Sequence, residues 1–460
     1  MKSTSTARHP TAQATVRGDC LNRRSRRREV STMVATDELR ASNVARFDHL
    51  VSDRAVHREA YVDPAVFDAE LKRIFGRVWV YVAHESQLRQ PGDFVTSWIG
   101  RQPVIVARSA DRRLHVLMNR CTHRAATVCQ ERAGTASHFR CAYHGWTFRN
   151  DGTLISPTFG SGYDAEDFRV EDYSLAAAPR VDAYRGFVFA SLAPAGPTLA
   201  EHLGNARTYI DLFCDLAPAG DIEVGAAGSN HYGYAGNWKL QAENGVDGYH
   251  PNFVHQAFLD NGRGGLAMQL FNGESAGRAA DLGRGHALLD SRPTLGDVHE
   301  RAFRGNPGGQ AHYELLVDRL GAERAAEVIR TNGGQGFNLL VFPNLQLIQI
   351  QIRVIHPRRV DLTEIDLYPT LLAGASEQTN AARLRSHEGF YGPAGGGAPG
   401  DLEMFRRVQE GLAVESVEWL PLLRGLRRTE LGPNGELIGH VTDEHPQRAF
   451  YRRWAEEMAG

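Results

Sequence analysis

Residues 121–146 read CTHRAATVCQERAGTASHFRCAYHGW. Cys121 and His123 stand in one short run, and Cys141 and His144 in another, so the spacing is C-x-H-x17-C-x2-H. Two thiolates and two imidazoles can hold a metal centre, and zinc is one option, although zinc sites usually pair Cys with Cys and His with His. One Cys and one His in each run instead favour a [2Fe–2S] cluster, in which Cys121 and Cys141 bind one iron and His123 and His144 bind the other. Cys129, between the runs, is interpreted as a buried thiol.

A second stretch rich in polar side chains, NWKLQAENGVDGYHPNFVHQAF, occupies residues 237–258. Its important spacing is Asp247-x2-His250-x4-His255. In a straight α-helix five residues turn about 500°, so the two histidines would point roughly 140° apart. For both to bind one ion the helix must break or widen between them, and Pro251 is a reason for such a break. Two imidazoles and one carboxylate on one face of Fe(II) leave positions open for O2 and a substrate.

Both stretches resemble those of the Rieske non-haem iron ring-hydroxylating oxygenases. Cys-Ala-Tyr-His-Gly-Trp is similar to the second cluster loop of that family, and the second stretch resembles the catalytic helix of its benzoate/toluate-like large (α) subunits. The resemblance covers roughly residues 45–455. It implies that His250 and His255 bind the mononuclear iron, that Asp247 lies between the two metal centres, and that Asn244 lines the iron pocket.

The resemblance places the third iron ligand, a carboxylate, at the start of a C-terminal helix. The corresponding segment here is PGDLEMF over residues 399–405, with Gly400 in place of the first Asp of the family pair. We therefore expect Asp401 to be the ligand, with Glu403 as the fallback. An Asp at this position can also act as a helix N-cap, so a purely structural role stays open.

The fold implied by the resemblance is α+β, with a small all-β Rieske domain followed by a larger catalytic domain of antiparallel sheet and helices, of helix-grip type. We place the Rieske domain and an N-terminal helix at 45–175 and the catalytic mononuclear-iron domain at 176–460. Residues 1–40 are expected to be a disordered tail, because residues 1–32 carry eight Lys and Arg residues against two acidic ones. Met33 is an alternative start.

Local patterns predict several elements. Asp63-Pro64 predicts a capped helix that runs to about Phe75. Short strands broken near residues 100–103 and 111–113 are expected between Phe94 and Leu117. The alternating run 345–354, followed through Pro357-Arg358-Arg359 by 362–367, predicts an antiparallel hairpin. Residues 392–400 predict a loop, with a helix from Leu402.

Composition limits the class of protein. The 460 residues are 42% hydrophobic and 23% charged with a net charge of -2, which is typical of a globular chain and argues against binding nucleic acid or membrane through bulk charge. No run approaches the ~18 consecutive apolar residues of a membrane span. Five cysteines are too few, and an odd number, for a disulfide-stapled secreted protein. We expect a cytoplasmic protein.

The activity implied by the resemblance is that of a terminal oxygenase, which adds both atoms of O2 to an aromatic ring as a cis-diol. An aromatic acid is the favoured substrate. A Rieske mono-oxygenase or O-demethylase shares both metal sites and stays open, whereas the long chain after the cluster motif argues against a Rieske electron carrier. No G-x-G-x-x-G follows a strand, so NADH is expected to act indirectly, through a separate reductase and perhaps a ferredoxin.

The resemblance also implies an assembly. A trimer, or an α3β3 complex with a small β subunit, is expected, in which His144 faces Asp247 of a neighbouring subunit. The expected bridge between the metals runs from His144 through Asp247 to His250, with Asp247 accepting the outer N–H of both of these imidazoles. Arg353 on a strand and Arg263 in a loop are candidates to receive a substrate carboxylate, and ordinary surface arginines are the alternative.

Overall fold

The structure is a computed structural model that describes residues 46–260, 271–330, 336–348 and 350–460. The chain divides into two units, Met1–Arg46 and Phe47–Gly460, and the elements below belong to the second. The expected tail over 1–40, the alternative start Met33 and the candidate Arg263 lie outside the described residues.

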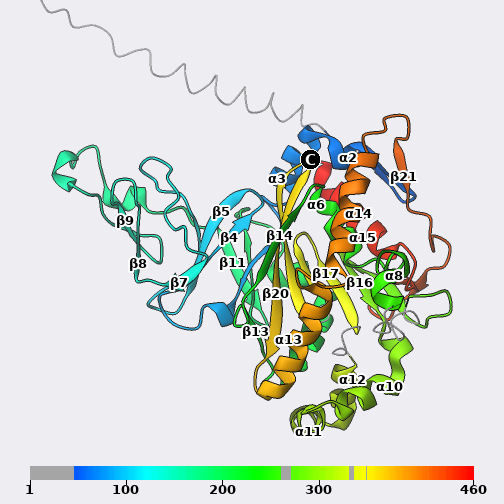
Figure 1. Cartoon of the computed structure of the whole chain (residues 1–460). Helices are drawn as coiled ribbons and strands as arrows, with labels where there is room; N and C mark the ends of the chain where they lie inside the picture. Colours follow the sequence, from blue (N-terminus) through cyan, green and yellow to red (C-terminus); the bar gives the residue numbers. More distant parts are fainter. Residues whose placement is uncertain (1–45, 261–270, 331–335, 349) are drawn as a thin grey trace, which may run out of the picture. The chain divides into compact units, whose positions relative to one another are not determined.

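The first Cys and His pattern lies in an all-β region, which contains two small antiparallel sheets (Figure 1). The strand order is β6-β5-β4-β7 in one sheet and β10-β9-β8 in the other. Their bounds are β4 (Asp93–Ile99), β5 (Gln102–Arg108), β6 (Leu114–Met118), β7 (Ala133–Thr135), β8 (His138–Arg140), β9 (Thr147–Arg149) and β10 (Leu154–Ser156). The strands expected between Phe94 and Leu117 are therefore confirmed, together with their breaks.

Two further small sheets connect the N-terminal segment with later parts of the chain. The first has the order β11-β12-β3 and the second the order β1-β2-β21. Their bounds are β1 (Val51–Ser52), β2 (Ala55–His57), β3 (Val80–His84), β11 (Arg180–Tyr184), β12 (Phe187–Ser191) and β21 (Trp419–Pro421).

The larger region is built on one antiparallel sheet. Among the described residues ten strands form it, in the order β13-β20-β19-β18-β17-β16-β15-β23-β22, with β14 also paired to β20. Their bounds are β13 (Ile222–Val224), β14 (Asn230–Tyr234), β15 (Arg278–Gly283), β16 (His286–Asp290), β17 (Phe337–Val341), β18 (Leu345–Ile348), β19 (Gln351–Arg359), β20 (Leu362–Leu372), β22 (Glu430–Leu431) and β23 (Leu437–His440).

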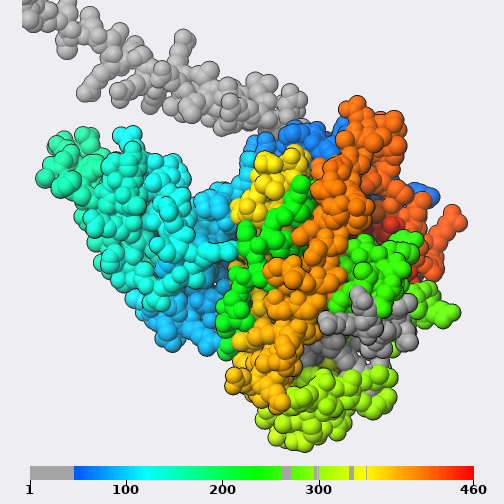
Figure 2. Space-filling view, in the orientation of Figure 1, coloured from blue at the N-terminus to red at the C-terminus, as the bar shows by residue number. Residues whose placement is uncertain are grey.

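Helices pack around this sheet, and Figure 2 shows α13 and α14, in orange, covering one of its faces. The helices are α2 (Glu59–Val62), α3 (Pro64–Arg73), α4 (Leu199–Leu203), α5 (Ala206–Asp215), α6 (Trp238–Asn244), α7 (Pro251–Val254), α8 (Gln256–Phe258), α10 (Arg292–Gly305), α11 (Gly309–Leu320), α12 (Ala322–Ile329), α13 (Glu377–Tyr391), α14 (Ala398–Gly411) and α15 (His445–Met458). Of the helices in the described part of the chain, none is long and apolar enough to cross a bilayer.

Alternate residues of β19 face different layers, as the pleat of a strand requires. Ile352 and Val354 belong to a core cluster that also holds residues of α5 and α12. Gln351 faces the other way, and its Oε1 lies 2.9 Å from His387 Nε2 on α13. Arg353 shares the parity of Gln351, so it lies on the face covered by α13.

Two local predictions need correction. The alternating run 345–354 is two strands, β18 and β19, with Ile348 opposite Gln351. The apolar positions change from odd numbers at Leu345 and Leu347 to even numbers at Ile352 and Val354, and this change of phase marks the turn between the two strands. The hairpin with 362–367 exists, but Pro357 lies within β19 opposite Thr363, and the turn comes after Arg359. The capped helix is confirmed, since Asp63 accepts a hydrogen bond from Ala65 N at the start of α3.

The N-terminal helix α3 is joined to the larger region by a buried ion pair. Lys239 Nζ on α6 lies 2.5 Å from Glu70 Oε1 on α3, and both side chains are fully buried. The indole N–H groups of Trp238 and Trp454 also donate to Glu70, at 2.8 and 2.6 Å. The carboxylate therefore satisfies three donors from two helices, α6 and α15, and the Trp-Lys of the second motif is part of the packing.

We expect Glu70→Ala to lower the free energy of unfolding by about 3–5 kcal/mol, because it leaves Lys239 as an uncompensated buried charge. Urea unfolding measures the loss. The matched control is Asp68→Ala on the same helix, whose partner Arg101 and own side chain are both more than half exposed, and which should cost less than about 1 kcal/mol. Equal effects of the two substitutions would contradict the assignment.

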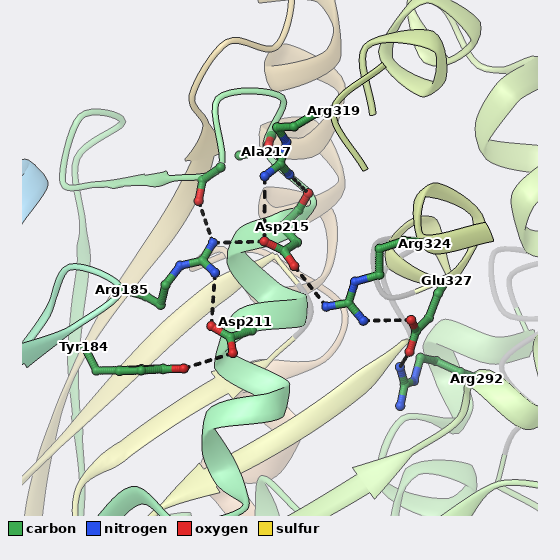
Figure 3. A network of polar contacts seen from close by, with 10 residues as sticks. Tyr184, Arg185, Asp211, Asp215, Ala217, Arg292, Arg319, Arg324 and Glu327 are labelled. Atoms are coloured by element: carbon green, nitrogen blue, oxygen red, sulfur yellow. Dashed lines mark hydrogen bonds and ion pairs between the residues drawn. The ribbon is translucent and has the colours of Figure 1, made fainter. Parts of the chain in front are cut away.

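A network of charged side chains fastens the helices that follow β16 (Figure 3). Arg185 binds Asp211 at 3.0 Å and Asp215 at 3.1 Å, both on α5. Asp215 also accepts from Arg324 of α12 at 2.9 Å and lies 3.8 Å from Arg319 of α11. Because these charges are mutually paired, the network is structural, and it joins α11 and α12 to α5.

Candidate active site

The first Cys and His pattern forms two loops of matching shape. In one loop Ala125 N donates to Cys121 O at 3.0 Å, and in the other Gly145 N donates to Cys141 O at 2.9 Å. The donor residue has a positive φ in both loops, +64° at Ala125 and +73° at Gly145. The left-handed region is unfavourable for alanine, and such strain is common at functional sites.

These loops direct the thiols inward and the imidazoles outward. Cys121 and Cys141 are buried and form no disulfide, while the rings of His123 and His144 lie 4.6 Å apart and His144 is exposed. Burial raises the pKa of the Cys121 thiol, while backbone N–H groups of His123 and Arg124 act in the opposite direction and Cys141 adds to the increase. Backbone N–H groups directed at a thiolate suit a cluster sulfur, so this donor set fits a [2Fe–2S] cluster.

Residues around the loops hold them in place. Asn119 accepts from the backbone N–H groups of Val128 and Cys129 at 3.0 and 2.9 Å, and Trp146 stacks on His123 with ring centroids 4.8 Å apart. The Cys129 thiol itself lies 3.5 Å from Glu131 Oε2, and burial raises its pKa to about 11. That environment agrees with the interpretation of Cys129 as a buried thiol.

The second pattern comes together from two helices and the residues beside them. His250 and His255 flank the short helix α7, and Asp401 lies in the first turn of α14. Asp401 Oδ1 is 3.6 Å from His250 Nε2 and 3.4 Å from His255 Nε2. A metal about 2.1 Å from three ligands on one octahedral face holds their atoms about 3 Å apart. The observed convergence therefore fits a 2-His-1-carboxylate iron site.

The electrostatics of this site support the same assignment. Burial lowers the pKa of His255 more than the Asp401 charge raises it, and the charges of His250 and Arg353 add to the lowering. Burial also acts to lower the pKa of His250, but Asp247 and Asp401 outweigh it. Nδ1 of each ring makes no hydrogen bond to the described residues. Imidazoles whose Nε2 atoms converge on a carboxylate are suitable metal ligands.

Two details of the sequence interpretation change. Pro251 does not break a helix but begins α7, where its missing N–H costs nothing, and the helical geometry ends at His255 with φ -102° and ψ 17°. Asp401 is not an N-cap, because α14 begins at Ala398 after Gly397. Of the expected bridge through Asp247, the half toward His250 lies within this chain, where Asp247 Oδ2 is 3.6 Å from His250 Nδ1.

The two remaining candidate residues, Asn244 and Glu403, differ in their distance from the iron site. Asn244 Nδ2 lies 3.2 Å from both His250 Nε2 and Asp401 Oδ1, so it adjoins the iron site. Glu403, the fallback ligand, instead pairs with Arg406 and Arg407 on the outside of α14.

A cavity of about 280 Å³ lies against the candidate iron ligands. Its apolar lining is formed by Phe258, Leu259, Phe271, Leu289, Ile348, Ile350 and Phe390. Asp247 lines this cavity and also a second one of about 170 Å³, which is bounded by Tyr249, Leu422 and Glu444. Asp247 therefore stands between the candidate iron site and an outer cavity.

A buried carboxyl group that the sequence interpretation did not single out is close to Asp247. Glu243 accepts hydrogen bonds from the hydroxyls of Tyr61 at 2.8 Å and Tyr451 at 2.5 Å. Burial raises its pKa to about 7, although both hydroxyls and Lys239 lower it. The only sequence signal was its place in the second motif, since the two tyrosines come from distant segments.

The pKa of Glu243 predicts a pH dependence of stability. Because the pKa of Glu243 is higher in the folded protein than in the unfolded chain, its protonated carboxyl group stabilises the fold. This contribution to the free energy of unfolding is complete below about pH 4.5 and is lost as the pH rises through about 7. Relative to the wild type, Glu243→Gln should therefore become more stable by on the order of 3 kcal/mol between pH 4.5 and 8. Melting temperatures of both proteins at several pH values measure the difference, and parallel curves would contradict the shifted pKa.

A cluster loop pair and a 2-His-1-carboxylate site in one chain define a two-centre iron oxygenase. The Rieske [2Fe-2S] domain family matches residues 78–161, and the ring hydroxylating alpha subunit (catalytic domain) family matches residues 221–460. The chain therefore belongs to the ring-hydroxylating oxygenase α-subunit family, and it is a Rieske non-haem iron oxygenase that carries a [2Fe–2S] cluster and a mononuclear iron. The α+β fold is confirmed, and the electron-carrier alternative is excluded.

Individual relatives agree with this assignment. The large subunit of 2-halobenzoate 1,2-dioxygenase from Burkholderia cepacia is 36% identical over 441 residues, which cover 91% of this chain and 92% of that protein. The α subunit of toluate 1,2-dioxygenase from Pseudomonas putida is 37% identical over 371 residues, 77% of this chain and 78% of that protein. Naphthalene 1,2-dioxygenase from a Rhodococcus species has a similar structure, with a TM-score of 0.77, 27% identity and coverage of 88% of this chain and 94% of that chain.

Proposed function

We propose that this terminal oxygenase converts a single-ring aromatic carboxylate into a cis-dihydrodiol carboxylate. The observation that carries the proposal is the position of His250, His255 and Asp401 on the wall of a cavity of about 280 Å³ that also has an apolar part. That volume lies at the lower end of the range for small-molecule sites, which suits one ring. Two relatives that match most of the chain are named for halobenzoate and toluate.

In this proposal each residue has a defined task. Nε2 of His250 and His255 and Oδ1 of Asp401 hold the iron, which when bound activates O2 with electrons supplied by the cluster. Asn244 Nδ2 orients Asp401 through its contact with Oδ1. The apolar walls bind the ring and exclude water. The reaction consumes the arene, O2, two electrons and two protons, and the arene retains both oxygen atoms.

The cluster assignment completes the proposal. Cys121 and Cys141 would hold one iron of the cluster, and His123 and His144, which are more exposed, would hold the other. We assign the Rieske domain to 45–175 and the catalytic domain to 176–460. NADH serves as the electron source through a separate reductase, with or without a ferredoxin, which favours the cytoplasm.

Electron transfer is proposed to cross a subunit boundary. In Figure 1 the strands β8 and β9, which flank the second cluster loop, lie on one side of the Phe47–Gly460 unit. Helix α8, which directly follows His255, lies on the opposite side. Tyr143, beside His144, is 65% exposed, and Tyr249, beside the outer cavity at Asp247, is 48% exposed. These surfaces suit a trimer or an α3β3 assembly in which His144 approaches Asp247 of a neighbouring subunit.

Product analysis tests the activity. The purified oxygenase, with a ferredoxin–reductase pair and NADH, should convert a substituted benzoate to a diol that carries two atoms from labelled O2. A product with one labelled oxygen would instead identify a mono-oxygenase, and loss of a methyl group from a methoxybenzoate an O-demethylase. Either outcome would overturn the proposed dihydroxylation.

A further inference from the structure

Arg353 is a buried cation in the middle of the larger sheet. It lies on β19 opposite Gln346 of β18 and Leu367 of β20, and only 3% of its surface is exposed. It lines the same cavity as His250, His255 and Asp401. A guanidinium cannot lose its charge in a protein, so its burial requires compensation.

That compensation is missing among the residues that the structure describes. The Arg353 guanidinium makes no ion pair or hydrogen bond with them, and its buried Nε has no partner. The described contact of its guanidinium is with the Tyr391 ring, whose centroid is 5.1 Å from Cζ. A cation–π contact is worth about 0.5–2 kcal/mol, which is less than the several kcal/mol that burying an ion costs.

The charges that line the cavity leave Arg353 unbalanced. Among the described residues of the lining, the acidic ones are Asp247 and Asp401 and the arginine is Arg353. Asp401 already faces the two histidines. With a ferrous ion bound, the two carboxylates offset the charge of the metal, and the cavity retains the positive charge of Arg353.

The surroundings of Arg353 match the shape of an aromatic acid. Ile348 and Ile350, at the turn between β18 and β19, and Phe390 on α13 supply apolar wall beside it. A planar guanidinium can donate two parallel N–H bonds to a carboxylate. A carboxylate at Arg353 would leave the attached ring in the apolar part of the cavity, beside the iron ligands.

We propose that Arg353 is the specificity-determining residue that binds the carboxylate of the substrate through its guanidinium. The inference rests on the proposed function, and it names the residue that makes an aromatic carboxylate, rather than a neutral arene, the preferred substrate class.

The experiment compares benzoate, 2-chlorobenzoate and 3-methylbenzoate with their neutral carboxamides. In wild-type holoenzyme the acids should have the lower KM and should raise the melting temperature of the protein. Arg353→Gln should raise the KM for the acids by at least about 30-fold, as expected for the loss of a charge-assisted double hydrogen bond. It should leave the KM for the amides within about threefold and abolish the melting shift produced by the acids.

Two further variants distinguish recognition from a structural role. Arg353→Lys keeps the charge but not the two parallel donors, so it should restore part of the affinity for acids. Arg383→Gln removes another buried arginine, which lies on α13 and donates to Thr370 rather than lining the cavity. It should leave the ratio of acid KM to amide KM unchanged. Iron content and the cluster spectrum of each variant serve as checks on the metal sites.

The outcomes separate the two proposals. If wild-type protein oxidises the acids and Arg353→Gln keeps their KM and their melting shift, the assignment of Arg353 is wrong while the proposed function stands. If wild-type protein binds and oxidises only neutral arenes, the proposed substrate class is wrong. If Arg353→Gln fails to fold, an unchanged acid-to-amide ratio in Arg353→Lys would overturn the assignment.

Discussion

Asp401→Ala is expected to remove the mononuclear iron while leaving the Rieske cluster in place. Substitution of a residue that only hydrogen-bonds to a metal ligand typically reduces metal affinity or activity by about 10–100-fold, and the loss of a ligand itself should reduce iron affinity by more. Turnover should therefore fall below about 1% of the wild type. Metal analysis should show that the cluster iron remains and the mononuclear iron is gone. The absorption spectrum of the cluster should be unchanged.

Glu403→Ala is the matched control for this prediction. Glu403 is on the same helix, two residues away, and its carboxylate pairs with Arg406 and Arg407. The control should retain both metals and nearly full activity. Wild-type iron content in Asp401→Ala, or iron loss in Glu403→Ala instead, would show that Asp401 is not the third ligand.

Asp247→Ala is expected to uncouple the two metal centres without emptying either. Asp247 contacts His250 and stands between the iron cavity and the outer cavity. Its loss removes the proposed connection between His144 of a neighbouring subunit and the iron site. In a single turnover with reduced protein, substrate and O2, reoxidation of the cluster should slow by about 100-fold, the upper range for residues behind metal ligands.

Glu444→Gln provides the comparison for Asp247. Glu444 lines the same outer cavity and accepts a hydrogen bond from Arg424 N at 2.8 Å. Because it does not line the iron cavity, cluster reoxidation should stay close to the wild-type rate. Normal reoxidation in Asp247→Ala, with both metals present, would refute the coupling role.

Local features of this chain could be predicted because backbone geometry determines them. The two cluster loops follow from the spacing of Cys and His, and the start of α3 follows from Asp63-Pro64. The run 345–354 was interpreted too coarsely, because the apolar positions change from odd to even numbers between Leu347 and Ile352, and that change of phase is what separates β18 from β19. The interpretation of Pro251 as a helix break was wrong because proline is found both where helices end and where they begin.

Local sequence patterns could not predict the contacts between segments that are remote in the chain. Asp401 meets His250 and His255 only because α14 packs beside α7, about 150 positions apart in the chain. Family resemblance proposed that contact, and no spacing rule did. The Glu70–Lys239 pair and the Tyr61–Glu243–Tyr451 contacts likewise join segments that have no sequence relation to one another.

The sequence by itself determined the chemistry available to this protein: two thiolates and two imidazoles in one domain, and two imidazoles followed by a distant carboxylate in another. These properties depend on residue type and short spacing. The tertiary structure decided which carboxylate joins the histidines, that Glu403 does not, and that Arg353 is buried in the same cavity with no ion pair to the described residues. Those facts depend on packing between segments remote in the chain, since only folding determines which charges are removed from water and which of them find a partner.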